Sequence, residues 1–171
     1  MNAETISITN MNKSEKRIIK VKFGNIDKNN IEQMRQLNNL SLPVRYQSGF
    51  YARILNKMRH GMFAFYNDFI VGAISWKYDL IENQRAVYIM TITVLEEYKR
   101  YGIGSQLLQE LINIHKPILE IDFIYLHVQI NNELALQFYT KSNFENVKII
   151  ENYYTDIEPR NAYLLKLKLR D

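Results

Sequence analysis

The 171-residue chain contains no cysteine and only three histidines, so several kinds of chemistry are excluded at once. Without cysteine there is no disulfide bond, thiolate metal ligand or cysteine nucleophile. The histidines, His60, His115 and His127, are too scattered to predict a histidine-built metal centre. No apolar run approaches the roughly 20 residues of a membrane-spanning helix, and residues 1–17 lack the apolar core of a secretory signal. We expect a metal-free protein of the cytoplasm, which can also have a nuclear pool.

The net positive charge is small outside the N-terminal end of the chain. The net charge is +4, and residues 1–22 alone contribute +3 of it. A domain that binds nucleic acid through phosphates needs a basic face on its folded part, so direct nucleic-acid binding is disfavoured. Residues 1–16 are polar and show no hydrophobic periodicity. We therefore expect a disordered tail there and one folded domain over residues 17–171.

The hydrophobic pattern of the remaining chain predicts alternating helices and strands. Apolar spacings of three and four residues predict helices over 29–40, 49–59, 105–115 and 132–142. Runs rich in β-branched and aromatic residues predict strands over 17–23, 62–66, 69–78, 86–95, 123–130, 144–153 and 162–169. The order, β-α-α-β-β-β-α-β-α-β-β, is typical of a layered α/β fold.

A glycine-containing turn joins the predicted strand over 86–95 to the predicted helix over 105–115. Its sequence is Lys99-Arg100-Tyr101-Gly102-Ile103-Gly104. Glycines here let the backbone approach an anion, and the free amides and dipole of the helix N-terminus favour pyrophosphate. The turn lacks the third glycine of a dinucleotide-binding motif and the Lys-Ser/Thr of a P-loop. Because helix-opening turns also use glycine for structural reasons, this turn by itself leaves anion binding open.

Six short motifs are spaced along the chain. They are LPVRY (42–46), YIMTI (88–92), YKRYGIGSQLL (98–108), IYLHVQINNE (124–133), NNELALQFYTKSNFE (131–145) and ENYYTDIEP (151–159). In order and spacing they resemble the GNAT family of N-acetyltransferases, and within it the protein N-terminal acetyltransferases. The resemblance runs from about residue 17 to residue 169. It implies a GNAT α/β (α+β) fold, with a mixed, mostly antiparallel central sheet of about six or seven strands and about four helices.

The resemblance implies acetyl-CoA as co-substrate and no metal. The residues it assigns to acetyl-CoA are Ile92, Thr93, Val94, Lys99, Arg100, Tyr101, Gly102, Ile103, Gly104, Ser105, Asn132 and Tyr139. Amides of residues 92–94 then bind the thioester carbonyl, and the glycine turn holds the pyrophosphate. Tyr139 is implied to protonate the departing thiolate, although an aromatic core residue is the alternative. Lys99 departs from the Arg or Gln that usually opens the family's motif.

The catalytic residues that the resemblance implies are Tyr88 and His127, which act through an ordered water. The attacking α-amine has a pKa of about 7.7–8.0, so the base has a modest task. Histidine is the better proton acceptor near neutral pH, and tyrosine is better suited to position the water. Strand alternation places Tyr125, His127 and Gln129 on one face, and Tyr88 and Met90 on one face of their own strand. The alternative is that His127 is a core histidine.

Peptide recognition is implied for apolar and tyrosine side chains from distant parts of the chain. These are Leu42, Pro43, Val44, Tyr46, Met90, Tyr153, Tyr154 and Ile157. An apolar pocket lined by hydroxyls suits an N-terminal Met followed by a hydrophobic residue. Leu42 stands where relatives have a larger Phe. A difference of that size changes specificity by about 1–3 kcal/mol, which alters the preferred second residue without abolishing activity.

The implied function is direct transfer, in a ternary complex, of an acetyl group to the α-amine of proteins that start with Met and a hydrophobic residue. Two alternatives stay open. One is a GNAT enzyme that acetylates lysine side chains; a polyamine acceptor is disfavoured because the matched positions lack acidic residues. The other is a catalytically weak binding subunit of a ribosome-associated NatA/NatE complex. The implied partners are N-terminal peptides of nascent or finished proteins and the auxiliary and catalytic NatA subunits, with the ribosome contacted indirectly.

Overall fold

The computed structural model describes residues 17–170, so the tail predicted over residues 1–16 lies outside the described residues. Its strands are β1 (Lys22–Asn25), β2 (His60–Tyr66), β3 (Phe69–Ile81), β4 (Gln84–Val94), β5 (Phe123–Gln129), β6 (Glu145–Ile150) and β7 (Ala162–Lys168). The helices are α1 (Ile31–Ser41), α2 (Ser48–Leu55), α3 (Ile103–His115) and α4 (Glu133–Lys141), with a short 3-10 turn η1 (Glu96–Tyr98). This order confirms the predicted succession of helices and strands.

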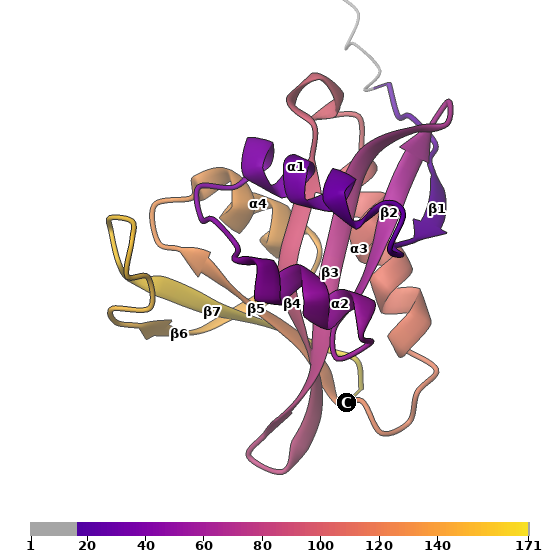
Figure 1. The fold of residues 1–171 in the computed structure, drawn as a ribbon. Coiled ribbons are helices and arrows are strands. Elements are labelled where there is room, and N and C mark those ends of the chain that lie inside the picture. Colours follow the sequence, from indigo (N-terminus) through magenta and orange to yellow (C-terminus); the bar gives the residue numbers. More distant parts are fainter. Residues whose placement is uncertain (1–16, 171) are drawn as a thin grey trace, which may run out of the picture.

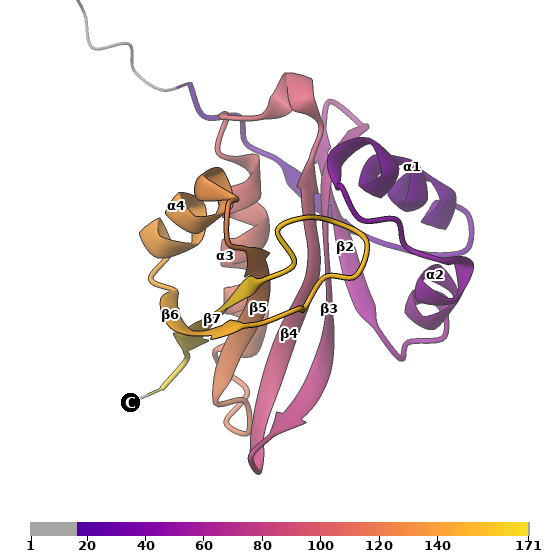
Figure 2. The ribbon, with the colours of Figure 1, turned by 90° about the vertical axis from the view of Figure 1, so that its left-hand side faces the viewer.

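All seven strands form one sheet in the order β1-β2-β3-β4-β5-β7-β6. Every neighbouring pair is antiparallel except β4 and β5, which run parallel. Figure 1 shows α1 and α2 in front of the sheet, and Figure 2 shows α3 and α4 on its other side. The sheet is therefore mixed, mostly antiparallel and covered on both faces, which confirms the predicted fold class.

Two apolar cores attach the helices to the sheet. On one face, Leu107, Leu108 and Leu111 of α3 are buried against β3 and β4. On the other face, Met34 of α1 and Tyr51 of α2 are buried in a second cluster that includes strand residues. Full burial of side chains of this size contributes about 1.5–3 kcal/mol each. The middle of β3 and β4 is thereby held rigid between the two layers.

The first predicted strand is wrong in its bounds. It was expected over 17–23, but β1 spans only Lys22–Asn25. The preceding segment bonds to the glycine turn instead: Ile19 N–H donates to the Tyr101 carbonyl at 3.1 Å. Gln106 completes the attachment, because its amide nitrogen donates to the Ile19 carbonyl at 2.6 Å and its oxygen accepts from Val21 N–H at 3.3 Å. With these backbone groups engaged, the segment does not extend the sheet.

The strand predicted over 144–153 is also too long, because β6 ends at Ile150 and residues 151–161 form a loop. Side chains and backbone from outside the strand hold this loop. Asn152 N–H donates to the Asn161 side chain at 3.0 Å, and the Gln129 amide donates to the Pro159 carbonyl at 2.8 Å. Tyr153 and Tyr154 therefore lie in a loop, where an alternating strand pattern does not fix their directions.

Candidate active site

The site lies where β4 and β5 part. Their parallel pairing covers only Ala86–Tyr88 against Phe123–Tyr125, and Figure 2 shows the two strands separating beyond it. On its other side β4 carries a β-bulge, since Ser75 pairs with Thr91 and Trp76 with Ile89, which leaves Met90 as the extra residue. Among the residues that the structure describes, the last residues of β4 thus have no strand partner on this edge, and their backbone groups there can bind a ligand.

The side chains of Ile92, Thr93 and Val94 are turned into the protein. Ile92 and Val94 pack against the α3 core, and the Thr93 hydroxyl donates to the Ala73 carbonyl at 3.4 Å. With these side chains packed against the core, the backbone of this strand end is the part best placed to contact a ligand. Close packing supports the arrangement: a Cβ added to Gly72 of β3 would stand 2.8 Å from the Thr93 carbonyl oxygen.

The glycine turn contains two residues with left-handed backbone conformation. Gly102, the N-cap of α3, has φ 79°, in the left-handed region that side chains disfavour, and Arg100 has φ 69°. Within residues 17–170 no side chain caps α3, so its first amides have no partner there that would compete with an anion. Ser105, Lys99 and Arg100 are exposed here, Tyr101 is half-buried, and Ile103 is buried. Lys99 is already engaged in an ion pair with Glu96.

Helix α4 adjoins the start of α3 at Gly104. A Cβ built there would lie 3.6 Å from Phe138 of α4 and 3.9 Å from Val94 of β4. Asn132 is the N-cap of α4 and its side-chain oxygen accepts from Ala135 N–H at 3.1 Å, so this residue has a structural role and keeps only its NH₂ for a ligand. Tyr139 is buried, which raises its pKa and keeps the hydroxyl protonated. This hydroxyl forms no hydrogen bond within residues 17–170 and is a free donor.

The predicted catalytic pair is brought together from β4 and β5. The Tyr88 hydroxyl lies 3.3 Å from His127 Nδ1 and 2.7 Å from the Tyr153 hydroxyl. The Tyr153 ring stacks on His127, with centroids 4.2 Å apart and planes at 19°. Tyr125 contacts both members of the pair. A set of protons consistent with a neutral imidazole has His127 Nδ1–H donating to Tyr88 and Tyr88 donating to Tyr153, which leaves the lone pair on His127 Nε2 free.

Burial separates the two catalytic candidates chemically. It lowers the pKa of His127 to about 4, so the imidazole is neutral at neutral pH. It also raises the pKa of Tyr88 well above the ordinary value of tyrosine, with the nearby Tyr153 adding to the effect. Tyr88 therefore remains a protonated donor near neutral pH, and His127 is the one of the two with a free lone pair. His127 is half-buried and lines the site, which argues against a purely core role.

The predicted peptide-binding residues come from two loops and the β4 bulge. The loop between α1 and α2 carries Leu42, Val44 and Tyr46, which are half-buried, and Pro43, which is exposed. Tyr46 donates to the Met90 carbonyl at 3.2 Å and so ties this loop to the bulge. From the loop between β6 and β7, Tyr153 is 37% exposed, and Tyr154 and Ile157 are half-buried. In Figure 2 this second loop lies across β4 on the side of α1 and α2.

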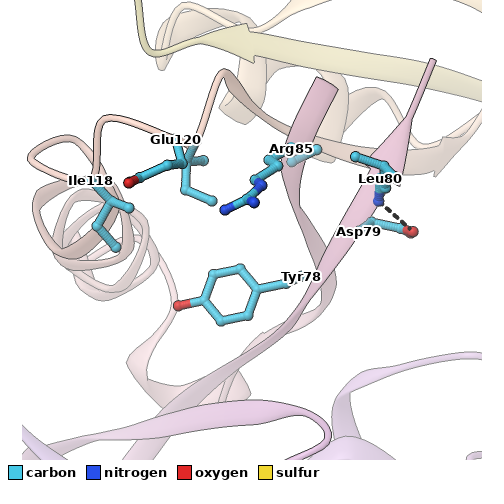
Figure 3. Close-up of a pocket in the computed structure, with 8 residues that line it drawn as sticks. Tyr78, Asp79, Leu80, Arg85, Ile118 and Glu120 are labelled. Atoms are coloured by element: carbon cyan, nitrogen blue, oxygen red, sulfur yellow. Dashed lines mark hydrogen bonds between the residues drawn. The ribbon is translucent and has the colours of Figure 1, made fainter. Parts of the chain in front are cut away.

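Two hollows lie outside this cluster. The larger, about 630 Å³, is at the far end of β4, between the β3–β4 hairpin and the segment after α3. Figure 3 shows Arg85 extending from β4 toward the loop that carries Ile118 and Glu120, with Tyr78 below. The second, about 430 Å³, includes Arg17 and Tyr101 in its lining. His127 lines neither hollow, and the Tyr153 ring stacks on its imidazole.

The described part of the chain, residues 17–170, holds no group of three His, Asp or Glu side chains arranged for a metal. None of its helices is long and apolar enough to cross a membrane.

Sequence reasoning missed two charged residues behind the catalytic pair. Lys77 and Asp79 of β3 form an ion pair at 2.7 Å, and Tyr125 donates to the same carboxylate at 2.8 Å. Opposite charges at alternate strand positions share a face, and that signal was present in the sequence. Nothing in the sequence said which residues they would face.

Comparison with known proteins gives a consistent result. The profile of the acetyltransferase (GNAT) family matches residues 31–144. Probable N-acetyltransferase san of Drosophila melanogaster is 41% identical over 150 residues, 88% of this chain and 82% of that protein. N-alpha-acetyltransferase 50 of Danio rerio is 40% identical over 151 residues, 88% of this chain and 90% of that protein.

A solved structure extends the likeness to three dimensions. Arabidopsis thaliana Naa50, in complex with the bisubstrate analogue CoA-Ac-MVNAL, superposes with a TM-score of 0.78 at 39% sequence identity, over 86% of this chain and 97% of that one. The chain therefore belongs to the acetyltransferase (GNAT) family. Both the predicted resemblance and the predicted GNAT fold are confirmed.

Proposed function

We propose that this protein is an acetyl-CoA-dependent N-terminal acetyltransferase for polypeptides that begin with Met and a hydrophobic residue. The observation that carries the proposal is the cluster of Tyr88, His127 and Tyr153 at the parting of β4 and β5, beside the apolar α1–α2 loop. The bisubstrate analogue bound to the Arabidopsis relative contains CoA joined to a peptide that starts with Met-Val. That chemistry matches both halves of the site described above.

The residues present fit acetyl-CoA, which supplies an acetyl thioester and a thiol leaving group. The α3 amides beyond Gly102, together with Arg100, suit the pyrophosphate. The free β4 edge at residues 92–94 presents backbone N–H groups to the thioester oxygen, where negative charge develops during transfer. The buried Tyr139 hydroxyl, which remains protonated, is available to the sulfur.

The chain's own residues then handle two protons. As the peptide nitrogen forms its bond to the acetyl carbon, His127 accepts one N–H proton through a water that the Tyr88 hydroxyl orients. As the carbon–sulfur bond breaks, Tyr139 gives one proton to the sulfur and regains it from solvent. The histidine suits this task because it is neutral, and a positioned base of this kind contributes about 10²–10⁴-fold to a rate.

Acceptor choice follows from the two loops. Leu42 and Val44 offer apolar surface for the first two side chains of the peptide, and the hydroxyls of Tyr46 and Tyr154 lie near its backbone path. Burial raises the pKa of Tyr46 and of Tyr154 to about 12, so both stay protonated. The Tyr46 hydroxyl donates to the Met90 carbonyl and can only accept from a peptide, whereas the Tyr154 hydroxyl can donate. Such a pocket favours an uncharged Met side chain, and none of the residues assigned to it is a carboxylate that would suit a polyamine.

The proposal extends to the protein's setting in the cell. We propose that residues 17–171 act as one catalytic domain, in the cytoplasm and with a nuclear pool. We also propose association with the auxiliary and catalytic subunits of NatA in an NatE-type assembly, which would bring the enzyme near nascent chains at the ribosome. The support for this partnership is the similarity to N-alpha-acetyltransferase 50. Co-purification with tagged NatA subunits tests it.

An acetyl-transfer assay with four peptides tests the catalytic proposal. Three begin with Met-Leu, Met-Lys and Ser-Glu, and the fourth has a blocked N-terminus and a free lysine. We expect rapid turnover of Met-Leu, slower turnover of Met-Lys and little of the others. Turnover of the blocked peptide alone would assign the enzyme to the lysine-acetylating class. Acetyl-CoA binding without turnover of any peptide would favour a binding subunit.

A further inference from the structure

Behind Tyr88, the side of the sheet that faces the active site carries a set of polar contacts with no role in the scheme above. The register sets Lys77 of β3 opposite Tyr88 of β4, and Tyr88 opposite Tyr125 of β5. Directly opposite residues of neighbouring strands point to the same face. At the next pair of positions on the same face, Asp79 lies opposite Ala86. Lys77, Tyr88 and Tyr125 therefore form a row, with Asp79 at its side.

The Asp79 carboxylate is held at both oxygens. Its Oδ1 accepts from the Leu80 backbone N–H at 3.0 Å, the bond drawn in Figure 3. Its Oδ2 accepts from the Tyr125 hydroxyl at 2.8 Å and from Lys77 Nζ at 2.7 Å. Burial raises the pKa of this carboxyl, but the bonds from Lys77 and Tyr125 outweigh burial and hold the pKa below its ordinary value. The group is thus ionised near neutral pH.

Both partners of Asp79 lie against Tyr88. The Tyr125 ring is 4.8 Å from the Tyr88 ring between centroids, and Lys77 Nζ is 5.4 Å from the Tyr88 centroid. Ala86 is fully buried beside them, and its methyl group leaves room for Tyr125 to reach across β4 to Asp79. The carboxylate therefore joins β3 to β5 across the strand that carries Tyr88.

This arrangement adds little stability on its own. The side chains of Lys77 and Asp79 are 36% and 26% exposed, and ion pairs so near solvent contribute about 0–1 kcal/mol. Its larger effect is geometric, because the Tyr88 hydroxyl must meet both His127 and Tyr153. A shift of about 1 Å in such a group can cost a large factor in rate.

We propose that Asp79 and Tyr125 are positioning residues that hold the Tyr88 ring so that its hydroxyl stays on His127. This inference rests on the proposed function, in which Tyr88 orients the water used by His127. Neither Asp79 nor Tyr125 is a proton carrier in the reaction. Their contribution therefore disappears when Tyr88 has no hydroxyl to position.

A double-mutant cycle tests this directly. Tyr125→Phe keeps the ring and removes only the bond to Asp79, so we expect kcat for the Met-Leu peptide to fall about tenfold with both KM values unchanged. Asp79→Asn should lower kcat by a similar factor. In a Tyr88→Phe background the further loss from Tyr125→Phe should be less than about twofold. Tyr163→Phe and Asp68→Asn, changes outside the row, serve as matched controls.

An equal loss from Tyr125→Phe in both backgrounds would overturn the inference, as would an effect on KM alone. Thermal unfolding of each variant shows whether a loss of activity reflects folding. A second readout does not depend on turnover: the NMR titration of the His127 ring should change in Tyr125→Phe as it does in Tyr88→Phe. Identical wild-type and Tyr125→Phe titrations would contradict the inference. Absence of acetyl transfer by the wild type would count against the proposed function alone.

Discussion

The glycine turn and the acceptor cleft are built in opposite ways. The turn is one contiguous segment, residues 99–105, and it acts through backbone amides in a conformation fixed by Gly102. The cleft gathers side chains from two loops and two strands, between residues 42 and 157. Its chemistry depends on register, burial and the hydrogen bonds among aromatic residues. A local site can thus be read from a short motif, whereas an assembled one is defined only by the contacts of distant residues.

Substitutions in the two regions should also have different effects on activity. Changes in the turn should weaken acetyl-CoA binding and leave the chemical step nearly intact. Changes in the cleft should lower kcat or peptide affinity and leave acetyl-CoA binding intact. Each of the following predictions tests this distinction.

The largest effect is expected from His127→Gln. Loss of the neutral acceptor should lower kcat about 100-fold, while the Kd for acetyl-CoA, measured by calorimetry, stays within about twofold of wild type. His60→Gln is the matched control, because His60 also has a pKa lowered by burial but is not part of the cluster. A loss confined to acetyl-CoA affinity would show that the cleft and the turn are not separable.

Gly102→Val should have the next largest effect. A β-branched residue at φ 79° is strained by about 1–3 kcal/mol, and relief of that strain would turn the amides away from the pyrophosphate. We expect the Kd for acetyl-CoA to rise about 30-fold, with kcat at saturation changed less than threefold. Gly49→Ala is the control, since a Cβ there meets nothing within 4 Å. An unchanged Kd would show that the turn does not bind acetyl-CoA.

Stability should depend on pH because of the buried histidines. The folded pKa of His127 is about 4, below the unfolded value of about 6.5, and burial also lowers the pKa values of His60 and His115. The unfolded chain thus binds more protons, so stability is full above pH 6.5 and is lost as pH falls toward 4. The half-exposed His127 should account for about 1 kcal/mol between pH 7 and 5 after allowance for solvent screening.

Urea unfolding at pH 7, 6 and 5 measures this dependence, and His127→Gln should flatten it. The low pKa of His127 also has a kinetic consequence. We expect kcat/KM to rise near pH 7–8 because the substrate α-amine loses its proton there, and not because His127 does. That rise should persist in the residual activity of His127→Gln. A rise of kcat/KM near pH 6 that is seen in the wild type and is absent from His127→Gln would contradict the low pKa of His127.

Glu96→Gln should have the smallest effect. It releases Lys99 from its ion pair beside the turn, and the freed charge should lower the KM for acetyl-CoA about twofold at low salt. Added salt should remove the difference. Glu151→Gln, a change of the same charge elsewhere on the surface, provides the comparison. A raised KM would indicate that the pair orders the turn.

Most of the fold was predictable, because the apolar periodicity of the central elements agrees with the face that they bury. Leu107 and Leu111, for example, are spaced for one helix face and are fully buried. The pattern is weaker in α4 and β6, where Leu134 and Ile149 are exposed. The two strands with wrong bounds failed for a shared reason. Backbone groups near Ile19 and Asn152 bond to side chains and turns far along the chain, and such competition leaves no local hydrophobic signal.

By itself the sequence determined the order of elements, the absence of cysteine chemistry, the glycine turn and the resemblance to GNAT enzymes. These features depend on neighbouring residues, whose spacing and backbone preferences are local. Only the tertiary structure decided that β4 and β5 part after Tyr88, that Met90 forms a bulge, and that Asp79 reaches Tyr125. Register and burial set these contacts and the pKa of His127, because desolvation and hydrogen bonding depend on which distant side chains meet.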